Sequence, residues 1–197
     1  MKLSPERNSR LTASNFAAAM GLNPYQSRQK LYRQILGLEP RFKGNEMTEY
    51  GNLHEPDAVD AYEAETGTIV EADNERQQFI IHPEHDWLGC TPDGFINDIK
   101  DMLVEFKCPY SQRLYENVPA YYLPQIQGQM MIAGAAYCHF VCWTPDDIAV
   151  WGVASRQDYQ DEMLELLAEF WHSVQSREEP KRKKKPLLPE VSIERIL

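Results

Sequence analysis

The sequence predicts a single α+β domain in which helices flank a mixed central sheet. Apolar residues recur at helical spacing early in the chain, at the shorter spacing of strands in the middle, and at helical spacing again near the end. The 197 residues are enough to build one hydrophobic core without disulfide or metal support. No internal repeat is visible. Helices, then strands, then a helix, a hairpin and a last helix form the order typical of one α+β domain.

Three helices are expected in the first third of the chain. Two short ones fall within residues 12–37: Thr12 or Ser14 can cap the first, and Ser27 can cap the second. A longer helix is expected over residues 48–66, where the apolar spacing is helical. Each helix ends at a glycine, namely Gly21, Gly37 and Gly67.

Short strands follow, separated by turns rich in proline, aspartate and glycine. Their expected ranges are 68–72, 77–82, 88–91, 95–97 and 102–107. The most distinct turn is Pro92-Asp93-Gly94, because each of these three residue types favours turn conformations.

The last third is expected to hold two helices around a hairpin. Pro124 suits the first turn of a helix that runs to about Gly134. Residues 137–143 and 148–154 predict the hairpin, and a long amphipathic helix follows it. Residues 177–197 contain prolines and a basic run, so we expect an extended tail outside the core.

Composition excludes several classes of protein. The opening MKLSPERNSR has no apolar segment of a secretory signal, and no later stretch approaches the length of a membrane span. Four cysteines without dense spacing suggest a reducing cytosol.

The net charge of −10 argues at first against a nucleic-acid partner, because phosphate contacts need surplus Lys and Arg. The charge is distributed unevenly, however. Residues 1–43 carry eight basic and two acidic residues, residues 44–176 carry five and 24, and residues 177–197 carry seven and four. Such asymmetry permits a local anion-binding face, although charge that serves only solubility is the simpler interpretation of this pattern by itself.

The densest chemical signal is TPDG followed by VEFK. Alternation along a strand places Glu105 and Lys107 on one face, and a short hairpin can bring Asp93 beside them. Two carboxylates suit Mg²⁺, which activates water for phosphodiester hydrolysis, and a lysine can position that water. Taken singly, a Pro-Asp-Gly turn beside an exposed Glu–Lys pair is the simpler interpretation.

Two helices add polar residues that could reach this site. Glu55 shares a helix face with Ala58, Val59 and Tyr62, and a buried carboxylate needs a partner or a metal. It could equally lie at the edge of the apolar stripe. Gln125 stands at the start of the helix opened by Pro124, where it could reach a site or simply cap the helix.

The cysteines offer weaker signals. Cys138 and Cys142 flank His139, but residues four apart on one strand suit small buried side chains better than a metal centre. Cys90 and Cys108 lie near the proposed site without a paired base for nucleophilic catalysis.

The segments GNLHEPDA, TPDG, VEFKCP and LPQIQ, in this order and at these separations, resemble the phage lambda exonuclease-like viral recombination (alkaline) exonucleases of the PD-(D/E)XK nuclease superfamily. The resemblance covers roughly residues 7–135. It implies a restriction-endonuclease-like core within residues 48–175 of a domain spanning residues 1–176. It also implies a processive Mg²⁺-dependent exonuclease that degrades the 5′-phosphorylated strand of duplex DNA to mononucleotides and leaves 3′ tails for recombination by single-strand annealing.

The resemblance also implies roles for individual residues. Asp93 and Glu105 would be metal ligands, helped by the backbone carbonyl of Phe106, and Mn²⁺ would substitute for Mg²⁺. Lys107 would activate or position the attacking water. Glu55 would lie at a second or water-bridged metal position, and Gln125 would contact the nucleophile or substrate.

Family members also grip the 5′-phosphate of the strand being cut. The matching positions here are Arg7, Ser14, Thr91 and Arg113, with Tyr122 beside Gln125 on the DNA. Two guanidinium groups, two hydroxyls and a helix N-terminus would form a strong phosphate pocket.

The same resemblance implies a ring-shaped homotrimer on duplex ends and a single-strand annealing protein as partner. We expect no membrane association and a cytoplasmic location, which is the cytoplasm of a bacterial host if the protein is encoded by a phage or prophage. Two rival functions stay open. One is a structure-specific endonuclease of the same superfamily. The other is a non-enzymatic acidic protein that mimics nucleic acid.

Overall fold

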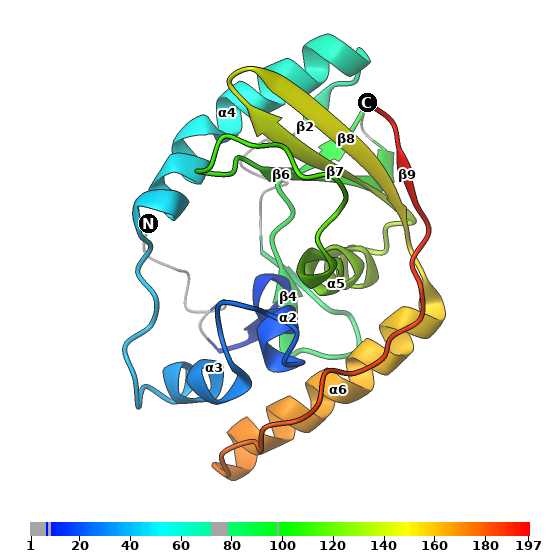
Figure 1. The fold of residues 1–197 in the computed structure, drawn as a ribbon. Helices are drawn as coiled ribbons and strands as arrows, with labels where there is room; N and C mark the ends of the chain where they lie inside the picture. Colours follow the sequence, from blue (N-terminus) through cyan, green and yellow to red (C-terminus); the bar gives the residue numbers. More distant parts are fainter. Residues whose placement is uncertain (1–6, 8, 72–78, 98) are drawn as a thin grey trace.

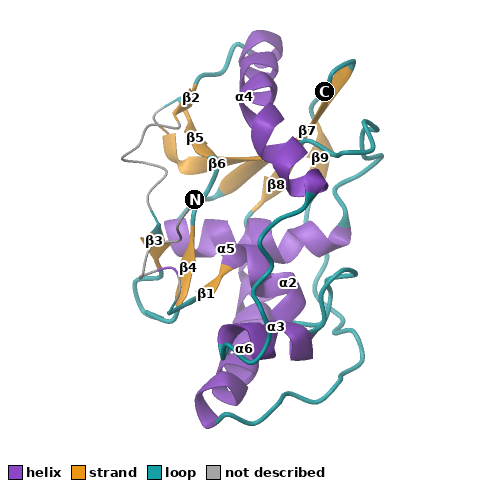
Figure 2. Ribbon diagram, turned by 90° about the vertical axis from the view of Figure 1, so that its left-hand side faces the viewer, coloured by secondary structure: helices purple, strands orange, loops and turns teal. Residues whose placement is uncertain are grey.

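The structure is a computed structural model that describes residue 7 and residues 9–71, 79–97 and 99–197. Its main sheet has six strands in the order β2-β5-β6-β7-β8-β9. Helix α4 covers one face of this sheet and α5 covers the other, with α6, α2 and α3 beyond α5 (Figures 1 and 2). The expected α+β architecture with a mixed sheet is confirmed.

The sheet is antiparallel except at its centre. Strands β5 (Gly94–Ile96) and β6 (Ile99–Lys107) form the short hairpin that was expected after the Pro-Asp-Gly turn. Strand β6 runs parallel to β7 (Tyr137–Thr144), which forms the second expected hairpin with β8 (Asp147–Ala154). The short strand β2 (Val70–Glu71) closes one edge of the sheet.

Alternation along β6 separates the two faces of the sheet. Leu103 packs with Ile126 and Met130 of α5 (Leu123–Ala133), whereas Val104 and Phe106 pack under α4 (Glu46–Thr66). Because side chains alternate along a strand, Glu105 and Lys107 share the α5 face with Leu103. The helix that follows Pro124 therefore decides what surrounds these two residues.

The N-terminal helices lie where they were expected, but neither Thr12 nor Ser14 caps the first one through its side chain. The 3₁₀ turn η1 (Ala13–Asn15) leads into α2 (Phe16–Ala19), and Ser27 accepts a hydrogen bond from Lys30 N at 3.2 Å to cap α3 (Arg28–Ile35). Helix α4 begins two residues earlier than expected, because Asn45 and Thr48 form a reciprocal capping box. It ends at Gly67, whose φ of 67° is the left-handed conformation that glycine tolerates.

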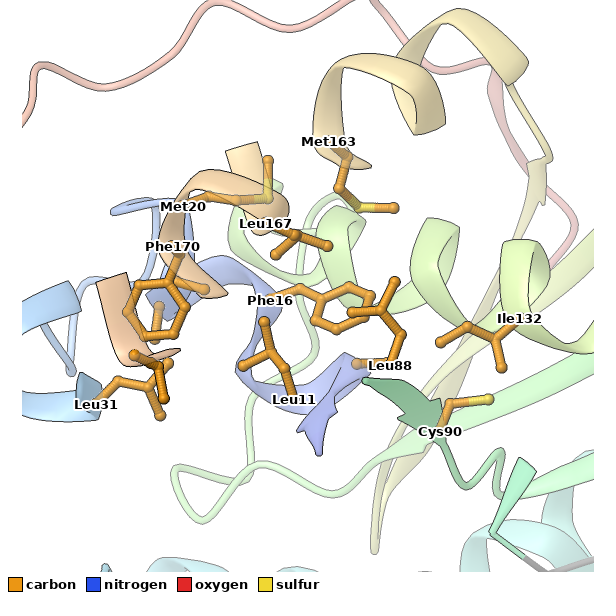
Figure 3. Close-up of a cluster of buried hydrophobic side chains, with 14 of the residues drawn as sticks. Leu11, Phe16, Met20, Leu31, Leu88, Cys90, Ile132, Met163, Leu167 and Phe170 are labelled. Carbon is orange, nitrogen blue, oxygen red and sulfur yellow. The ribbon is translucent and has the colours of Figure 1, made fainter. Parts of the chain in front are cut away.

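A second, three-stranded sheet was not expected as a separate unit. Strand β4 (Leu88–Cys90) lies between β1 (Leu11–Thr12), with which it is parallel, and β3 (Ile80–Ile81). Under it lies a buried apolar cluster that joins α2, α3 and α6 (Gln157–Ser176) (Figure 3). Its members include Leu11, Phe16, Leu88, Leu167 and Phe170. The N-terminal elements are thus part of the core.

The C-terminal segment is extended, but the expectation that it lies outside the core is wrong. Residues 178–192 run back along α6, and β9 (Ile193–Arg195) pairs with β8 as the last strand of the main sheet (Figure 1). Leu188 and Val191 pack against the buried clusters. The free edge of β8 and an apolar surface supply partners that local composition does not reveal.

The four cysteines are buried and form no disulfide. Cys138 and Cys142 are fully enclosed in the sheet, as expected for small core side chains. Among the described residues, no helix combines the length and apolar character needed to cross a membrane.

Candidate active site

The turn before β5 and the end of β6 bring Asp93 to Glu105, as the hairpin predicts. Gly94 pairs with Val104 in the antiparallel register, so the residue before Gly94 lies beside the last residues of β6. Asp93 Oδ2 accepts a hydrogen bond from Phe106 N at 2.8 Å. This bond fixes the carboxylate against the strand that carries Glu105.

The carboxylate of Glu105 is buried and receives three donors. Its side chain is only 2% exposed. Oε1 accepts from Lys107 Nζ and Gln125 Nε2, and Oε2 accepts from Gln129 Nε2 at 2.7 Å. Hydrogen bonds to an ionised acceptor are the stronger kind, so these donors offset the cost of burying the charge.

Helix α5 supplies both glutamines from its first turns. Pro124 lies in the first turn as expected, and Gln125 and Gln129 are one turn apart on the face toward β6. The N-cap residue of α5, Tyr122, makes no side-chain capping bond, and Gln125 binds Glu105 instead. The side chain of Gln125 thus turns toward Glu105, which is the contact that a site role requires.

Charge crowding changes the proton affinities of the site. Burial raises the pKa of Asp93 well above its usual range, and the carboxylates of Glu105 and Glu55 raise it further. Burial opposes the charge on Lys107, but Glu105 and Asp93 outweigh it and raise the pKa of the ammonium group. The site thus holds a fixed cation among carboxylates in excess.

Glu55 approaches from α4, on the other side of β6. Cys108, directly after Lys107, donates a hydrogen bond from Sγ to His54 O at 3.5 Å, which places this part of α4 beside the end of β6. Burial raises the pKa of Glu55, and Glu105 raises it further. The half-buried side chain therefore belongs to the same charge cluster and does not turn fully to solvent.

Lys107 has an aromatic neighbour in addition to its carboxylates. Its Nζ lies 5.2 Å from the centre of the Tyr122 ring, within range of a cation–π contact. The ring and Glu105 together hold the ammonium group in one place.

The donor set suits a hard divalent cation. In the described part of the chain, no three His, Cys, Asp or Glu side chains converge closely enough to hold a metal by themselves. Asp93 and Glu105 offer two carboxylates, and Mg²⁺ characteristically binds through one or two carboxylates and keeps several waters. Burial, and then the carboxylates of Glu105 and Glu55, raise the pKa of Asp93, and a bound cation would oppose both effects by stabilising the ionised carboxylate. The residues therefore fit the ion that the sequence suggests.

Two of the residues expected at the 5′-phosphate directly follow a pair of neighbouring strands. The parallel register pairs Thr12 of β1 with Gly89 of β4. Ser14 lies in η1 just after β1, and Thr91 directly follows β4, which η1 contacts. Ser14 is exposed, and its hydroxyl lies 3.1 Å from that of Thr12.

The two arginines expected at the 5′-phosphate lie in different surroundings. Arg7 lies near Cys90, since its charge opposes the burial that raises the pKa of that thiol. Arg113 is exposed on the segment between β6 and η2 (Ala120–Tyr122), and it makes no hydrogen bond or ion pair to any other described residue. The fold thus gathers Arg7, Ser14 and Thr91 around the end of β4 and leaves Arg113 on its loop.

Gln129 also contacts Glu105, although no role in the site was predicted for it from the sequence. Its spacing of four from Gln125 on a helix was the available signal, because residues at i and i+4 share a face. Its side chain is 2% exposed, and its Oε1 has no hydrogen-bond partner.

Most of the chain matches a known protein family. Residues 4–136 match the YqaJ-like viral recombinase domain, which is about two thirds of the chain. The chain belongs to the YqaJ-like viral recombinase family. This membership confirms the expected resemblance to viral recombination nucleases, and every residue proposed for the site lies within the matched range.

This YqaJ-like chain is also similar to part of a larger protein of African swine fever virus. It is 26% identical over 156 residues to Protein D345L of African swine fever virus, strain Badajoz 1971 Vero-adapted, and 28% identical to the protein of isolate Tick/South Africa/Pretoriuskop Pr4/1996. Each match covers 64% of this chain and 44% of the viral protein, so the chain spans less than half the length of these relatives.

Among solved structures, the alkaline exonuclease LHK-Exo of Laribacter hongkongensis matches with a TM-score of 0.71 and 25% identity. This match covers 88% of this chain and 91% of that one. A phage-related exonuclease from Haemophilus somnus 129PT matches with a TM-score of 0.58 and 15% identity, over 86% and 93% of the two chains. The YqaJ-like chain therefore shares its fold with these exonucleases.

Proposed function

We propose that this YqaJ-like protein is a Mg²⁺-dependent exonuclease that degrades the 5′-phosphorylated strand of duplex DNA in the 5′→3′ direction and leaves 3′ tails for viral recombination. The observation that carries the proposal is the buried cluster in which Lys107, Gln125 and Gln129 all bind the carboxylate of Glu105, beside Asp93. Family membership and the fold shared with alkaline exonucleases support the reaction class.

Asp93 and Glu105 would hold the metal, with the backbone carbonyl of Phe106 as a third oxygen. Glu55 would act through water or at a second metal position. When bound, Mg²⁺ lowers the pKa of a bound water and neutralises charge on the phosphate. Mn²⁺ would replace it, because both accept hard oxygen ligands in octahedral sites.

The side chains of the protein would position the reacting groups. Lys107 carries a fixed positive charge beside Glu105, so it can orient an attacking water and stabilise negative charge on the phosphate. Gln125 would contact the same water or the substrate through its amide. Tyr122 holds the ammonium of Lys107 in place from the other side.

A 5′-phosphate pocket would make the enzyme depend on DNA ends. Ser14 in η1 and Thr91 directly after β4 offer hydroxyl donors, and Arg7 adds a positive charge near Cys90. Arg113 would close the pocket from its loop when DNA binds. Each cleavage leaves a new 5′-phosphate on the shortened strand, which renews the ligand of this pocket and favours processive movement.

We further propose a ring-shaped homotrimer around the duplex and a single-strand annealing protein as its partner, acting in the cytoplasm of a bacterial host. Both assemblies rest on the family resemblance. Light scattering of the purified protein, alone and with duplex, tests the trimer directly.

Three DNA substrates test the function, each with and without Mg²⁺. We expect rapid release of mononucleotides from linear 5′-phosphorylated duplex, slower release from 5′-hydroxyl duplex, and no cleavage of closed circular duplex. Cleavage of the circle would support a structure-specific endonuclease instead. No Mg²⁺-dependent release from any substrate would contradict the proposal and favour a non-enzymatic binding protein.

A further inference from the structure

Five consecutive cations, residues 181–185, lie exposed on the extended segment that follows α6. Lys183 pairs with Glu169 of α6. Within the described parts of the chain, the other four form no ion pair. On a protein with a net charge of −10, such a run makes this part of the surface locally positive.

This run is held in place at both ends, unlike a free basic tail. Before it, Arg33 pairs with Glu179 at 2.6 Å, and Gln29 Nε2 donates to Pro180 O at 3.0 Å. After it, Leu188 and Val191 pack against the core, and β9 joins the sheet. Fixed cations lose less conformational entropy on binding than flexible ones.

A hollow of about 540 Å³ lies beside the cationic run. Its walls come from Pro24 after α2, Tyr121 of η2, and Lys185 and Leu188 of the C-terminal segment. Glu190 is the acidic residue in the lining, so an anion would bind toward the Lys185 side.

A row of tyrosines connects this hollow with the active site. Tyr25 is 80% exposed, and its ring meets Tyr121 edge-on at 5.8 Å. Tyr121 in turn lies 4.4 Å from Tyr122, the ring under Lys107. Asn23 Oδ1 accepts from Tyr25 N at 2.8 Å, which fixes the turn that presents the exposed ring.

We propose that Tyr25, Tyr121 and the cations Lys184 and Lys185 bind single-stranded DNA that leaves the active site. This inference rests on the proposed nuclease function, since that function generates the strand. Exposed rings beside fixed cations are the combination that binds single strands, because bases stack on the rings while lysines contact phosphates. Duplex DNA fits less well, because its base faces are stacked inside the helix.

Fluorescence anisotropy of a labelled oligo(dT) with a 5′-hydroxyl, in EDTA, tests the surface without hydrolysis. Tyr25→Ala should weaken binding about 5-fold or more, as loss of one stacking ring does, whereas Tyr25→Phe should retain it. Lys184→Ala/Lys185→Ala should reduce the salt dependence, lowering the slope of log K against log[salt] by about 1.4 for two phosphate contacts. The matched Lys184→Arg/Lys185→Arg protein should keep the wild-type slope.

Cleavage assays separate this inference from the proposed function. The surface variants should keep the wild-type initial rate on duplex ends, whereas Lys107→Ala should lose cleavage and keep oligo(dT) binding. Binding that depends on Tyr25 in a protein without nuclease activity would support the surface and contradict only the function. Wild-type affinity in both Tyr25→Ala and the double alanine variant, or no oligo(dT) binding by the wild type, would overturn the inference and leave the cations to an acidic protein partner.

Discussion

At the scale of single residues, the site is defined by a buried carboxylate and its donors. The carboxylate of Glu105 accepts hydrogen bonds from Lys107, Gln125 and Gln129. The strand pattern predicted that Glu105 and Lys107 share a face, and the Pro-Asp-Gly turn predicted the approach of Asp93. Gln129 escaped prediction because a polar residue on a helix is usually solvated, and only the packing of α5 on β6 shows that it points inward.

Asp93→Asn should make the metal-free protein more stable at neutral pH. The folded-state pKa of Asp93 is raised, so its ionised form opposes folding above that pKa, and this cost disappears as the pH falls. Asparagine keeps an acceptor for Phe106 N without the charge. Thermal unfolding in EDTA should therefore give the variant a higher Tm at pH 8, with a difference that shrinks toward acid pH.

Mg²⁺ provides the control for this experiment. It should raise the Tm of the wild type, because a ligand that binds only the folded state stabilises it, and it should have little effect on the variant. A lower Tm for Asp93→Asn in EDTA at every pH would contradict the charge crowding described for this site.

Gln129→Met should weaken Mn²⁺ binding and activity by about 10- to 100-fold, the usual cost of losing a residue that supports a metal ligand. Gln127→Met is the matched control on the same helix, since Gln127 bonds only to backbone and side-chain groups remote from Glu105. It should lower the Tm and leave Mn²⁺ affinity unchanged. Calorimetric titration measures the Mn²⁺ affinity of the two variants. Equal affinities would show that Gln129 does not support the metal site.

At the scale of elements, the β5–β6 hairpin and α5 form the carboxylate cluster, and the pairing of β1 with β4 positions the residues expected at the 5′-phosphate. The β5–β6 hairpin and the start of α5 were predictable, because turn residues and a helix-opening proline mark them locally. The pairing of β1 with β4 was not, because two-residue strands leave no periodic signal and their partner lies far along the chain. That pairing places η1, which carries Ser14, in contact with β4, which Thr91 follows.

Arg7→Ala and Arg113→Ala test whether these elements form a phosphate pocket. Each change removes a charge that would contact the 5′-phosphate, so digestion of 5′-phosphorylated ends should fall about 10-fold or more, as for lost charge-assisted hydrogen bonds. Digestion of 5′-hydroxyl ends should change little. Initial rates on the two kinds of duplex measure this, and equal losses on both would place the phosphate elsewhere.

At the scale of the whole molecule, the C-terminal segment closes the structure. Its composition predicted a solvated tail, but the open edge of β8 and the apolar clusters hold it. The net charge of −10 was similarly uninformative, because it sums over local groups of cations: Arg7 near the start, Lys107 among the carboxylates of the site, and the run at residues 181–185. The packing of the C-terminal segment and the local grouping of charges both depend on contacts between distant parts of the chain, which a single sequence does not show.

Val191→Asp should destabilise the folded protein by about 2 kcal/mol or more, because a charge would replace a side chain that packs against both clusters. Leu187→Asp is the matched control, since Leu187 is 96% exposed and surface changes usually stay within about 0.5 kcal/mol. Urea unfolding measures the two free energies, and equal stability of both variants would mean that the segment does not pack as described.

We propose that the protein hydrolyses DNA through Asp93, Glu105 and Lys107. The most direct measurement is Mg²⁺-dependent release of nucleotides from linear 5′-phosphorylated duplex by Lys107→Ala and Asp93→Ala, with duplex binding measured in parallel. We expect release to fall to background in both variants while duplex binding stays close to that of the wild type. Full release of nucleotides by either variant would contradict the claim.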